Sequence, residues 1–140
     1  MPARAELSAS QRDGAALLGR ALMSAIFIWA GYGKLMSPAA TQAYFAKAGV
    51  VLPPLVWIVA VVVELLGGLA LLLGIQTRLV ALILGLWCIA TAITAHSNFA
   101  DADMQIHFMK NVAMAGGFVL LAAFGGGNHT LGSLFGRSRA

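Results

Sequence analysis

Charged residues are scarce in this sequence. Nine basic and five acidic residues occur in 140, so 10% of the chain is charged, whereas about 25% is usual in soluble domains. A soluble chain of this length would need far more polar surface, because small proteins have a high surface-to-volume ratio. Hydrophobic residues make up 60% of the chain, which excludes disorder. The composition therefore indicates an integral membrane protein with an all-α fold and one domain.

Cysteine and cofactor motifs are scarce or absent too. Cys88 is the single cysteine, so no disulfide can form within the chain, and we expect an inert core thiol. The sequence has no CxxC pair, no paired-histidine pattern for haem, and no Walker or Rossmann glycine motif. We therefore expect no intrinsic cofactor, and a self-sufficient redox enzyme is disfavoured.

Four apolar segments predict an antiparallel four-helix transmembrane bundle over residues 15–125. The expected helices cover about 15–36, 54–74, 79–96 and 106–124, and Ser37-Pro38 ends the first of them. The longer loops are 36–53 and 96–106. A polar N-terminal tail (1–14) and a C-terminal tail (126–140) flank the bundle. The N-terminal tail has no apolar core with a cleavage site, unlike a typical cleaved signal peptide.

Basic residues are divided unequally between the two sides of the predicted bundle. Four spans place both termini on one side, with six basic residues: Arg4, Arg12, Arg20, Arg78, Arg137 and Arg139. The other side carries three: Lys34, Lys47 and Lys110. Because cytoplasmic loops are enriched in Lys and Arg, both termini are predicted to be cytoplasmic. The basic residues form no run, so nucleic acid is not an expected partner.

Glu64 is the most informative residue, because it lies roughly 15 Å from either end of its predicted helix and so near the membrane midplane. Such a carboxyl usually faces the bundle interior. Gly67 and Gly68 share its helix face and would let another helix approach closely. Glu64 could carry a proton or accept a hydrogen bond from a quinone or ligand hydroxyl. The alternative is a hydrogen bond that locks two helices together.

Arg20, Gly31 and Lys34 lie on one stripe of the first predicted helix, which also holds Ser24 and Phe27. Either cation could pair with Glu64 or bind an anionic ligand, and Gly31 provides room for helix packing. Alternatively, both cations extend to opposite interfaces and contact lipid headgroups.

A second polar group is expected at the outer mouth of the bundle. Lys110 and Asn111 open the fourth predicted helix and, with Lys34, His96 and His107, could hold a small anion or a quinone carbonyl. The alternative is a solvated rim. His96, Asp101, Asp103 and His107 include metal-ligand types, but their spacing matches no recognised motif, so no metal is expected.

Aromatic and hydroxyl side chains complete the list of candidates. Trp87, Thr91 and Thr94 share a face of the third predicted helix, and the hydroxyls could line a polar cavity. The alternative is that each threonine bonds to a carbonyl of its own helix. The tryptophans and tyrosines could be interfacial anchors.

Several segments together resemble the DoxX family of small bacterial membrane proteins, over about residues 15–130. They are Gly19-Arg20, Gly31-Tyr-Gly-Lys34-Leu-Met-Ser-Pro38, Gly49, Val63-Glu64-Leu-Leu-Gly67-Gly68, Leu73-Gly74-Ile-Gln-Thr77-Arg78 and Phe108-Met-Lys110-Asn111. The resemblance implies a four-helix, multi-pass protein of the bacterial inner (plasma) membrane. Its named member is a subunit of a thiosulfate:quinone oxidoreductase, and other members look like membrane partners of soluble redox or stress-response proteins.

The sequence and the resemblance favour a quinone- or quinol-linked subunit or accessory of a membrane oxidoreductase system. Glu64 would handle a proton, while Lys34, Lys110 and Asn111 would orient the head group. The expected partners are the lipid bilayer, a quinone or small anion, and a soluble redox protein. The alternatives are a non-catalytic membrane anchor or scaffold for such a protein and, third, a small transporter. A homo-oligomer stays open.

Overall fold

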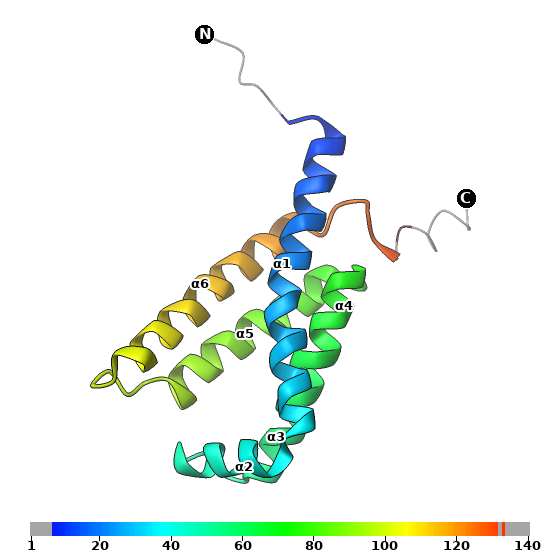
Figure 1. Ribbon diagram of the computed structural model, residues 1–140. Helices are drawn as coiled ribbons and strands as arrows, with labels where there is room; N and C mark the ends of the chain where they lie inside the picture. The colour runs from blue at the N-terminus through cyan, green and yellow to red at the C-terminus, as the bar shows by residue number, and fades with distance from the viewer. Residues whose placement is uncertain (1–6, 132, 134–140) are drawn as a thin grey trace.

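A computed structural model describes residues 7–131 and 133, and this part of the chain forms helices without any strand. Four stretches are long and apolar enough to cross a membrane (Figure 1): α1 (Ala9–Met36), the continuous stretch Pro53–Leu73, α5 (Thr77–Ala95) and α6 (Ala102–Phe124). The predicted all-α fold with four spans is therefore confirmed. The stretch Pro53–Leu73 consists of α3 (Pro53–Val61), the π-helical turn η1 (Val62–Leu66) and α4 (Gly67–Leu73).

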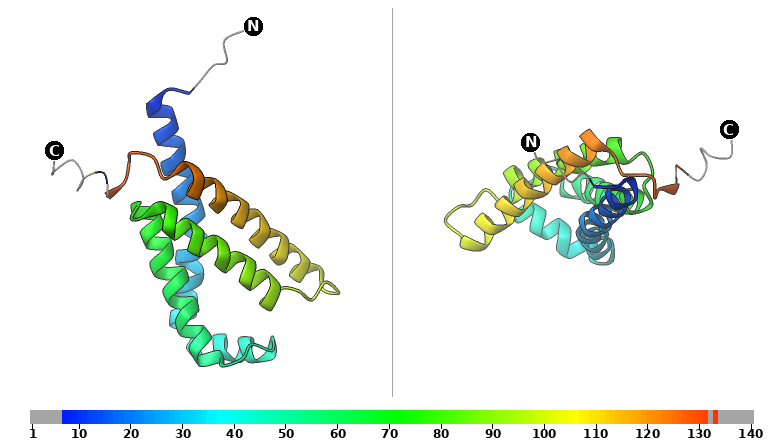
Figure 2. Two further views of the ribbon diagram at one scale, coloured as in Figure 1. Left: turned by 180° about the vertical axis from the view of Figure 1, so that it is seen from behind. Right: turned by 90° about the horizontal axis from the view of Figure 1, so that it is seen from above.

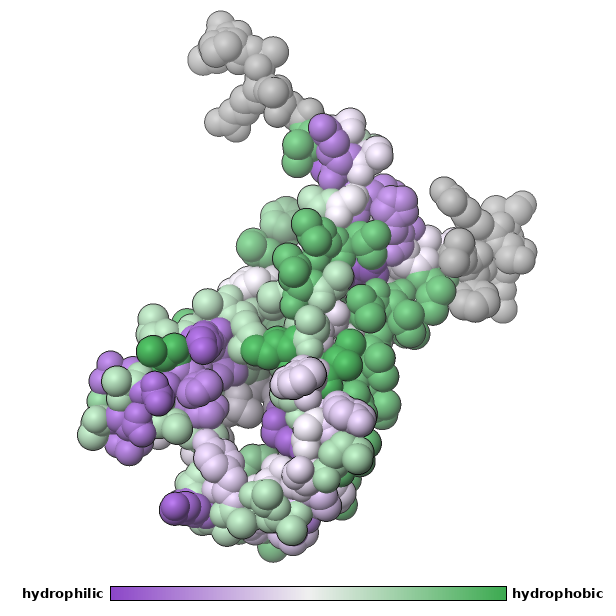
Figure 3. All heavy atoms as spheres, in the orientation of Figure 1, coloured by the Kyte–Doolittle hydropathy of each residue, from purple (hydrophilic) through white to green (hydrophobic). Residues whose placement is uncertain are grey.

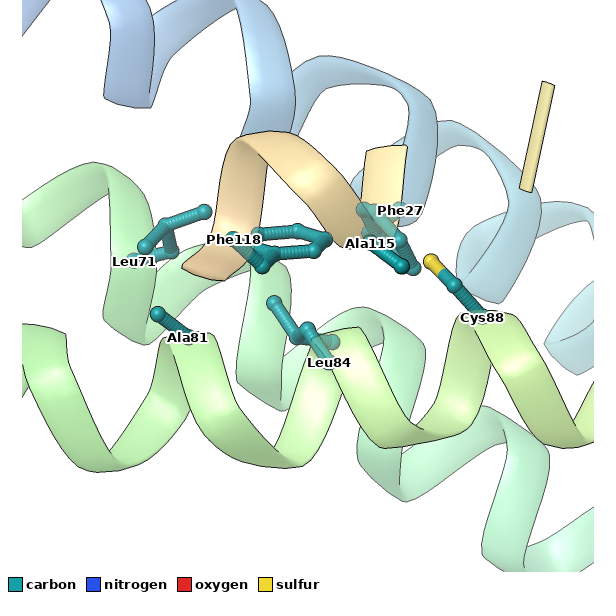
Figure 4. Packing of buried hydrophobic residues seen from close by; sticks show 7 residues of the cluster. All are labelled: Phe27, Leu71, Ala81, Leu84, Cys88, Ala115 and Phe118. Carbon is teal, nitrogen blue, oxygen red and sulfur yellow. The ribbon is translucent and has the colours of Figure 1, made fainter. Parts of the chain in front are cut away.

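The four spans form two pairs that cross at an angle. The stretch α3–η1–α4 runs beside α1, and α5 and α6 form a hairpin that diverges from them (Figure 2). The core lies where the pairs cross, and its side chains come from α1, α4, α5 and α6 (Figure 4): Phe27, Leu71, Ala81, Leu84, Cys88, Ala115 and Phe118. The rings of Phe27 and Phe118 meet edge to face, with centroids 5.4 Å apart. This contact holds α1 against α6.

Most large apolar side chains face outward instead of inward. Trp29 is 81% exposed, Leu86 72% and Phe124 80%. Green apolar surface covers the middle of the molecule, and purple polar side chains gather where α5 joins α6 (Figure 3). Exposed apolar surface on this scale is stable only in contact with lipid.

The first span begins earlier than predicted. The tail 1–14 was expected to precede the helix, but α1 begins at Ala9. Ser8 and Gln11 form a capping box, in which the Ser8 N–H donates to Gln11 Oε1 at 2.8 Å and the Gln11 N–H donates to Ser8 Oγ at 3.2 Å. Because these bonds satisfy two N–H groups that would otherwise lack partners, the polar residues 9–14 extend the helix.

The predicted loop 36–53 is wrong over ten residues, which form α2 (Pro38–Lys47). Pro38 does end α1 at Met36, but it also occupies the first turn of α2, where its missing N–H costs nothing. The loop 96–106 is shorter than expected for a similar reason. Asp101 caps α6 by accepting from the Asp103 N–H at 2.9 Å, so the helix begins at Ala102.

Three glycines bring the spans close together. A Cβ on Gly31 would lie 2.5 Å from the backbone nitrogen of Leu65, and one on Gly68 would lie 2.9 Å from Ile28 Cγ1. A Cβ on Gly67 would lie 3.1 Å from Leu84 Cδ2. The residues predicted for helix packing therefore lie at helix contacts, and Gly31 touches backbone. This places the Lys34 turn of α1 directly against η1.

Candidate ligand-binding site

Glu64 lies in η1 and forms an ion pair with Lys34 of α1. The distance from Lys34 Nζ to Glu64 Oε2 is 2.6 Å, and the exposed fractions of the two side chains are 25% and 7%. Gly31 and Lys34 are one helical turn apart, so the close approach at Gly31 brings the ammonium to the carboxylate. The structure therefore joins the two residues that the sequence offered as a pair.

Trp87 of α5 binds the other oxygen of the same carboxylate. Its indole N–H donates to Glu64 Oε1 at 3.0 Å. Trp57 donates in the same way to the Lys34 carbonyl at 2.8 Å. Trp87 thus binds the carboxylate of the ion pair, and Trp57 binds the backbone of Lys34. Trp87 was predicted to lie on the Thr91 face, but nothing in the sequence indicates its bond to Glu64.

Replacing Trp87 with Phe should lower the free energy of unfolding by about 1.5–3 kcal/mol, the range for a hydrogen bond to a charged group. Trp29→Phe is the matched control, because Trp29 is 81% exposed and should change stability by less than about 0.5 kcal/mol. Thermal unfolding of the two variants in detergent measures both effects. Equal losses of stability in the two variants would show that the hydrogen bond from Trp87 to Glu64 does not stabilise the protein.

A cavity of about 650 Å³ opens beside the ion pair, and we call it the Glu64 cavity. Its apolar wall includes Ile26 and Phe27 of α1, Phe45 of α2, and Met104 and Met114 of α6. The hollow between α2 and the α5–α6 end is visible in Figure 3. The polar side chains along it come from all sides of the hollow: Lys34, Thr41, Tyr44, Glu64, Trp87, Thr91, His96, His107, Lys110 and Asn111.

The predicted outer-mouth residues all line this cavity. His96 and His107 stack with ring centroids 5.1 Å apart. Thr91 donates to Asn111 Oδ1 at 3.2 Å, while the Asn111 amide donates to the His107 carbonyl at 2.9 Å. The Thr91 hydroxyl also lies within hydrogen-bond distance of the Trp87 and Cys88 carbonyls, at 2.9 and 3.0 Å, so its single proton has acceptors both in its own helix and across the cavity wall. Lys110 is exposed at this rim.

The His96 imidazole has a buried Nδ1 atom with no hydrogen-bond partner among the described residues. His96 also lines the cavity, so this unpartnered nitrogen belongs to a residue of the cavity wall. Within residues 7–131 and 133, no group of three or more His, Cys, Asp and Glu side chains could hold a metal ion. The polar side chains that line the cavity can donate and accept hydrogen bonds.

Stability should depend on pH through His96. Burial lowers the pKa of this imidazole below its ordinary value of 6.5, and His107 and Lys34 add to the effect by repelling a second positive charge. The unfolded chain therefore binds a proton that the folded chain does not. The contribution of His96 to the free energy of unfolding is therefore fully present above pH 6.5, and it is lost as the pH decreases toward the folded-state pKa.

Thermal unfolding in detergent between about pH 5 and pH 7.5, the range in which histidine titrates, measures this dependence. We expect the Tm to fall toward the acid end, and His96→Asn should flatten part of that fall. A variant whose pH profile matches that of the unmodified protein would show that another group is responsible.

Helix α2 supplies a wall that the sequence analysis missed. Ala40, Thr41, Tyr44 and Phe45 line the cavity, and the Tyr44 hydroxyl donates to the Ala95 carbonyl at 3.5 Å. These four residues are separated by one, three and one positions, which places them on one face of a helix. This pattern after Pro38 could have predicted α2 from the sequence.

Arg20 does not belong to this cavity. It is fully buried near the other end of α1, where Nη2 donates to the carbonyl of His129. The two cations on this face of α1 therefore lie in different environments: Lys34 lies at the Glu64 cavity, and Arg20 lies near the other end of the helix. Of the two cations that were predicted as possible partners of Glu64, the structure pairs Lys34 with it and places Arg20 elsewhere.

Four apolar spans and a buried ion pair beside an open cavity define a polytopic helical membrane protein with a candidate binding site inside its bundle. The chain belongs to the DoxX family, whose model matches residues 15–97, and this confirms the resemblance seen in the sequence.

Two relatives are inner membrane proteins of Escherichia coli. The chain is 40% identical to inner membrane protein YqjF over 122 residues, which cover 87% of this chain and 92% of YqjF. It is 35% identical to inner membrane protein YphA over 116 residues, which cover 79% of this chain and 83% of YphA. No solved structure matches. The protein is thus a multi-pass protein of the inner membrane.

Proposed function

We propose that the Glu64 cavity binds the head group of a quinone or quinol, in a subunit or accessory of a membrane oxidoreductase system. The observation that carries this proposal is a carboxylate, 7% exposed, that is held by Lys34 and Trp87 at the wall of a largely apolar cavity. A lipid-soluble ring with polar edges matches this combination, because binding sites pair apolar walls with a few placed polar groups.

Polar groups reach the cavity from two directions. Lys34 and Glu64 come from α1 and η1, whereas His96, Lys110 and Asn111 come from the end of the α5–α6 hairpin. A quinone carries carbonyl oxygens on opposite sides of its ring, so it offers an acceptor to each group. The apolar side chains Phe27, Phe45 and Met114 would contact the ring faces.

The Lys34–Glu64 pair can exchange a proton with such a ligand. Reduction of a quinone to a quinol takes up two electrons and two protons, and the reverse reaction releases them. In this proposal the chain provides binding and a proton path through Glu64, and a partner redox protein provides or accepts the electrons. The pair suits proton transfer because a proton can move between two groups 2.6 Å apart.

Binding of a short-chain ubiquinone analogue tests the proposal, with quenching of tryptophan fluorescence as the signal from Trp87. Glu64→Gln and Thr91→Val should each weaken binding, the first by at least about tenfold, which is about 1.4 kcal/mol. Thr94→Val is the matched control, because its hydroxyl only bonds the Ala90 carbonyl of its own helix.

Solvent extraction of the purified protein provides a second readout. We expect mass spectrometry to find retained quinone in the unmodified protein and less of it in Glu64→Gln. If no quinone is retained and the analogue binds all three variants equally, the proposal fails. Retention of a soluble protein that survives Glu64→Gln but not exchange of the loop 96–101 would favour the anchor or scaffold function instead.

A further inference from the structure

Arg20 is a buried cation that has no counter-charge among the described residues. Its exposed fraction is 0%, and Nη2 makes its one hydrogen bond, to the His129 carbonyl. The Nε and Nη1 atoms have no partner among residues 7–131 and 133, and the ion pair found in this part of the chain is Lys34–Glu64. A guanidinium carries five N–H donors, and an uncompensated buried charge is strongly unfavourable. Two of the three guanidinium nitrogens of Arg20 therefore lack an acceptor among the described residues.

The unpartnered Nη1 atom lies beside Gly74 and Thr130. A Cβ on Gly74 would collide with Nη1 and would lie 2.5 Å from Thr130 Cβ. Thr130 in turn lines a hollow of about 360 Å³ between the end of α4 and the segment after α6. Arg20 does not line this hollow itself, but its Nη1 atom lies close to Thr130, which does. We call this space the Thr130 hollow.

The Thr130 hollow has a polar side and an apolar side. Asn128, Thr130 and Ser133 contribute an amide and two hydroxyls, whereas Leu72 and Leu73 form the wall on α4. Since Leu73 is the last residue of a span, the hollow lies at one end of the membrane domain. Phospholipids place phosphate groups and acyl chains at this depth.

The surrounding backbone adds positive potential. A Cβ on Gly126 would lie 2.7 Å from Thr77 Oγ1 and 3.1 Å from Arg20 Cδ, so Arg20 neighbours the first residue of α5. No side chain caps the N-terminus of this helix among the described residues. A second cation, Arg78, packs against Gly125. A helix N-terminus next to two guanidinium groups favours an anion.

We propose that the Thr130 hollow binds a phosphate-bearing anion, with Arg20 as its counter-charge. The Thr130 hydroxyl and the Asn128 amide hydrogen that does not bind Asp13 supply further hydrogen bonds, and Leu72 and Leu73 accommodate an acyl chain. A phospholipid headgroup and free phosphate share this chemistry. The site is separate from the Glu64 cavity and does not depend on the function proposed for that cavity.

Thermal unfolding of the full chain tests the proposal after purification in detergent and removal of bound lipid. The probes are inorganic phosphate and mixed micelles that contain phosphatidylglycerol, with chloride and phosphatidylcholine as controls. We expect phosphatidylglycerol to raise the Tm more than phosphatidylcholine does. Arg20→Gln should raise the concentration of phosphatidylglycerol needed for a given rise in Tm at least about tenfold. Arg12→Gln removes an exposed charge from the same helix and should leave that concentration unchanged.

The remaining outcomes separate the two sources of the anion. A response to inorganic phosphate without one to phosphatidylglycerol assigns the site to free phosphate, and the reverse assigns it to lipid. If Arg20→Gln does not fold, Arg20→Lys keeps the charge and should retain only part of the response. The proposal is overturned if neither probe raises the Tm of the unmodified protein, or if the Arg20 and Arg12 variants respond equally.

Discussion

Gly31→Ala should destabilise the protein by about 3 kcal/mol, the upper part of the range for overpacking a core. The added Cβ would lie 2.5 Å from the Leu65 backbone nitrogen and 2.9 Å from its Cα. Since backbone cannot move aside as a flexible side chain can, α1 and η1 must separate. Separation here also lengthens the Lys34–Glu64 contact, because Lys34 is one turn from Gly31 and Glu64 precedes Leu65.

Gly33→Ala is the matched control and should change stability in the opposite direction. Gly33 lies on the same helix, and a Cβ there would meet nothing within 4 Å. Alanine in a helix interior is favoured over glycine by roughly 0.5–1 kcal/mol. Thermal unfolding in one detergent compares the two variants. A shift of the same sign and size in both would contradict the helix contact at Gly31.

Lys34→Met should lower the free energy of unfolding by about 3–5 kcal/mol, the cost of removing one partner from a buried ion pair. Glu64 would keep only the Trp87 N–H as a partner, and its side chain is 7% exposed. Glu64→Leu should be less harmful, because the 25% exposed Lys34 side chain can still turn toward water.

The double variant Lys34→Met/Glu64→Leu should recover much of this loss, because no unpaired charge stays buried. The recovery appears as a coupling free energy in a double-mutant cycle, and values of about 0.5–3 kcal/mol are usual for residues in contact. Lys47→Met, at the exposed end of α2, controls for loss of charge. Additive single effects would show that the two charges do not stabilise each other.

The polar residues of the Glu64 cavity could be predicted from the sequence because polar side chains are rare within membrane spans. A carboxyl near the middle of a span has few explanations besides an internal contact. The regular 3.6-residue spacing of a helix then put Gly31 and Lys34 on one face of α1. The same spacing put Asn111 near the mouth on α6. These inferences need only helix geometry and hydropathy, both of which are local properties of the sequence.

Other parts of the site depend on contacts that no local pattern contains. The bond from Trp87 to Glu64 joins residues 23 positions apart, and its existence depends on how α5 crosses η1. The π-helical turn at Val62–Leu66 has no signature in its residues, which are typical of an α-helix. Helix α2 was not predicted because it is only ten residues long and lies between two spans, although the spacing of its cavity-lining residues was a signal in the sequence.

The segment that follows α6 has a consequence for biosynthesis. Asn128 binds Asp13 through its backbone and side-chain N–H groups, at 3.0 and 3.1 Å, across 115 residues of sequence. Arg20 and His129 are joined across 109 residues. A ribosome adds Asn128 and His129 only after it has translated all four spans. The guanidinium of α1 is therefore synthesised long before the His129 carbonyl that binds it, and these contacts to α1 can form only after α6 has been translated.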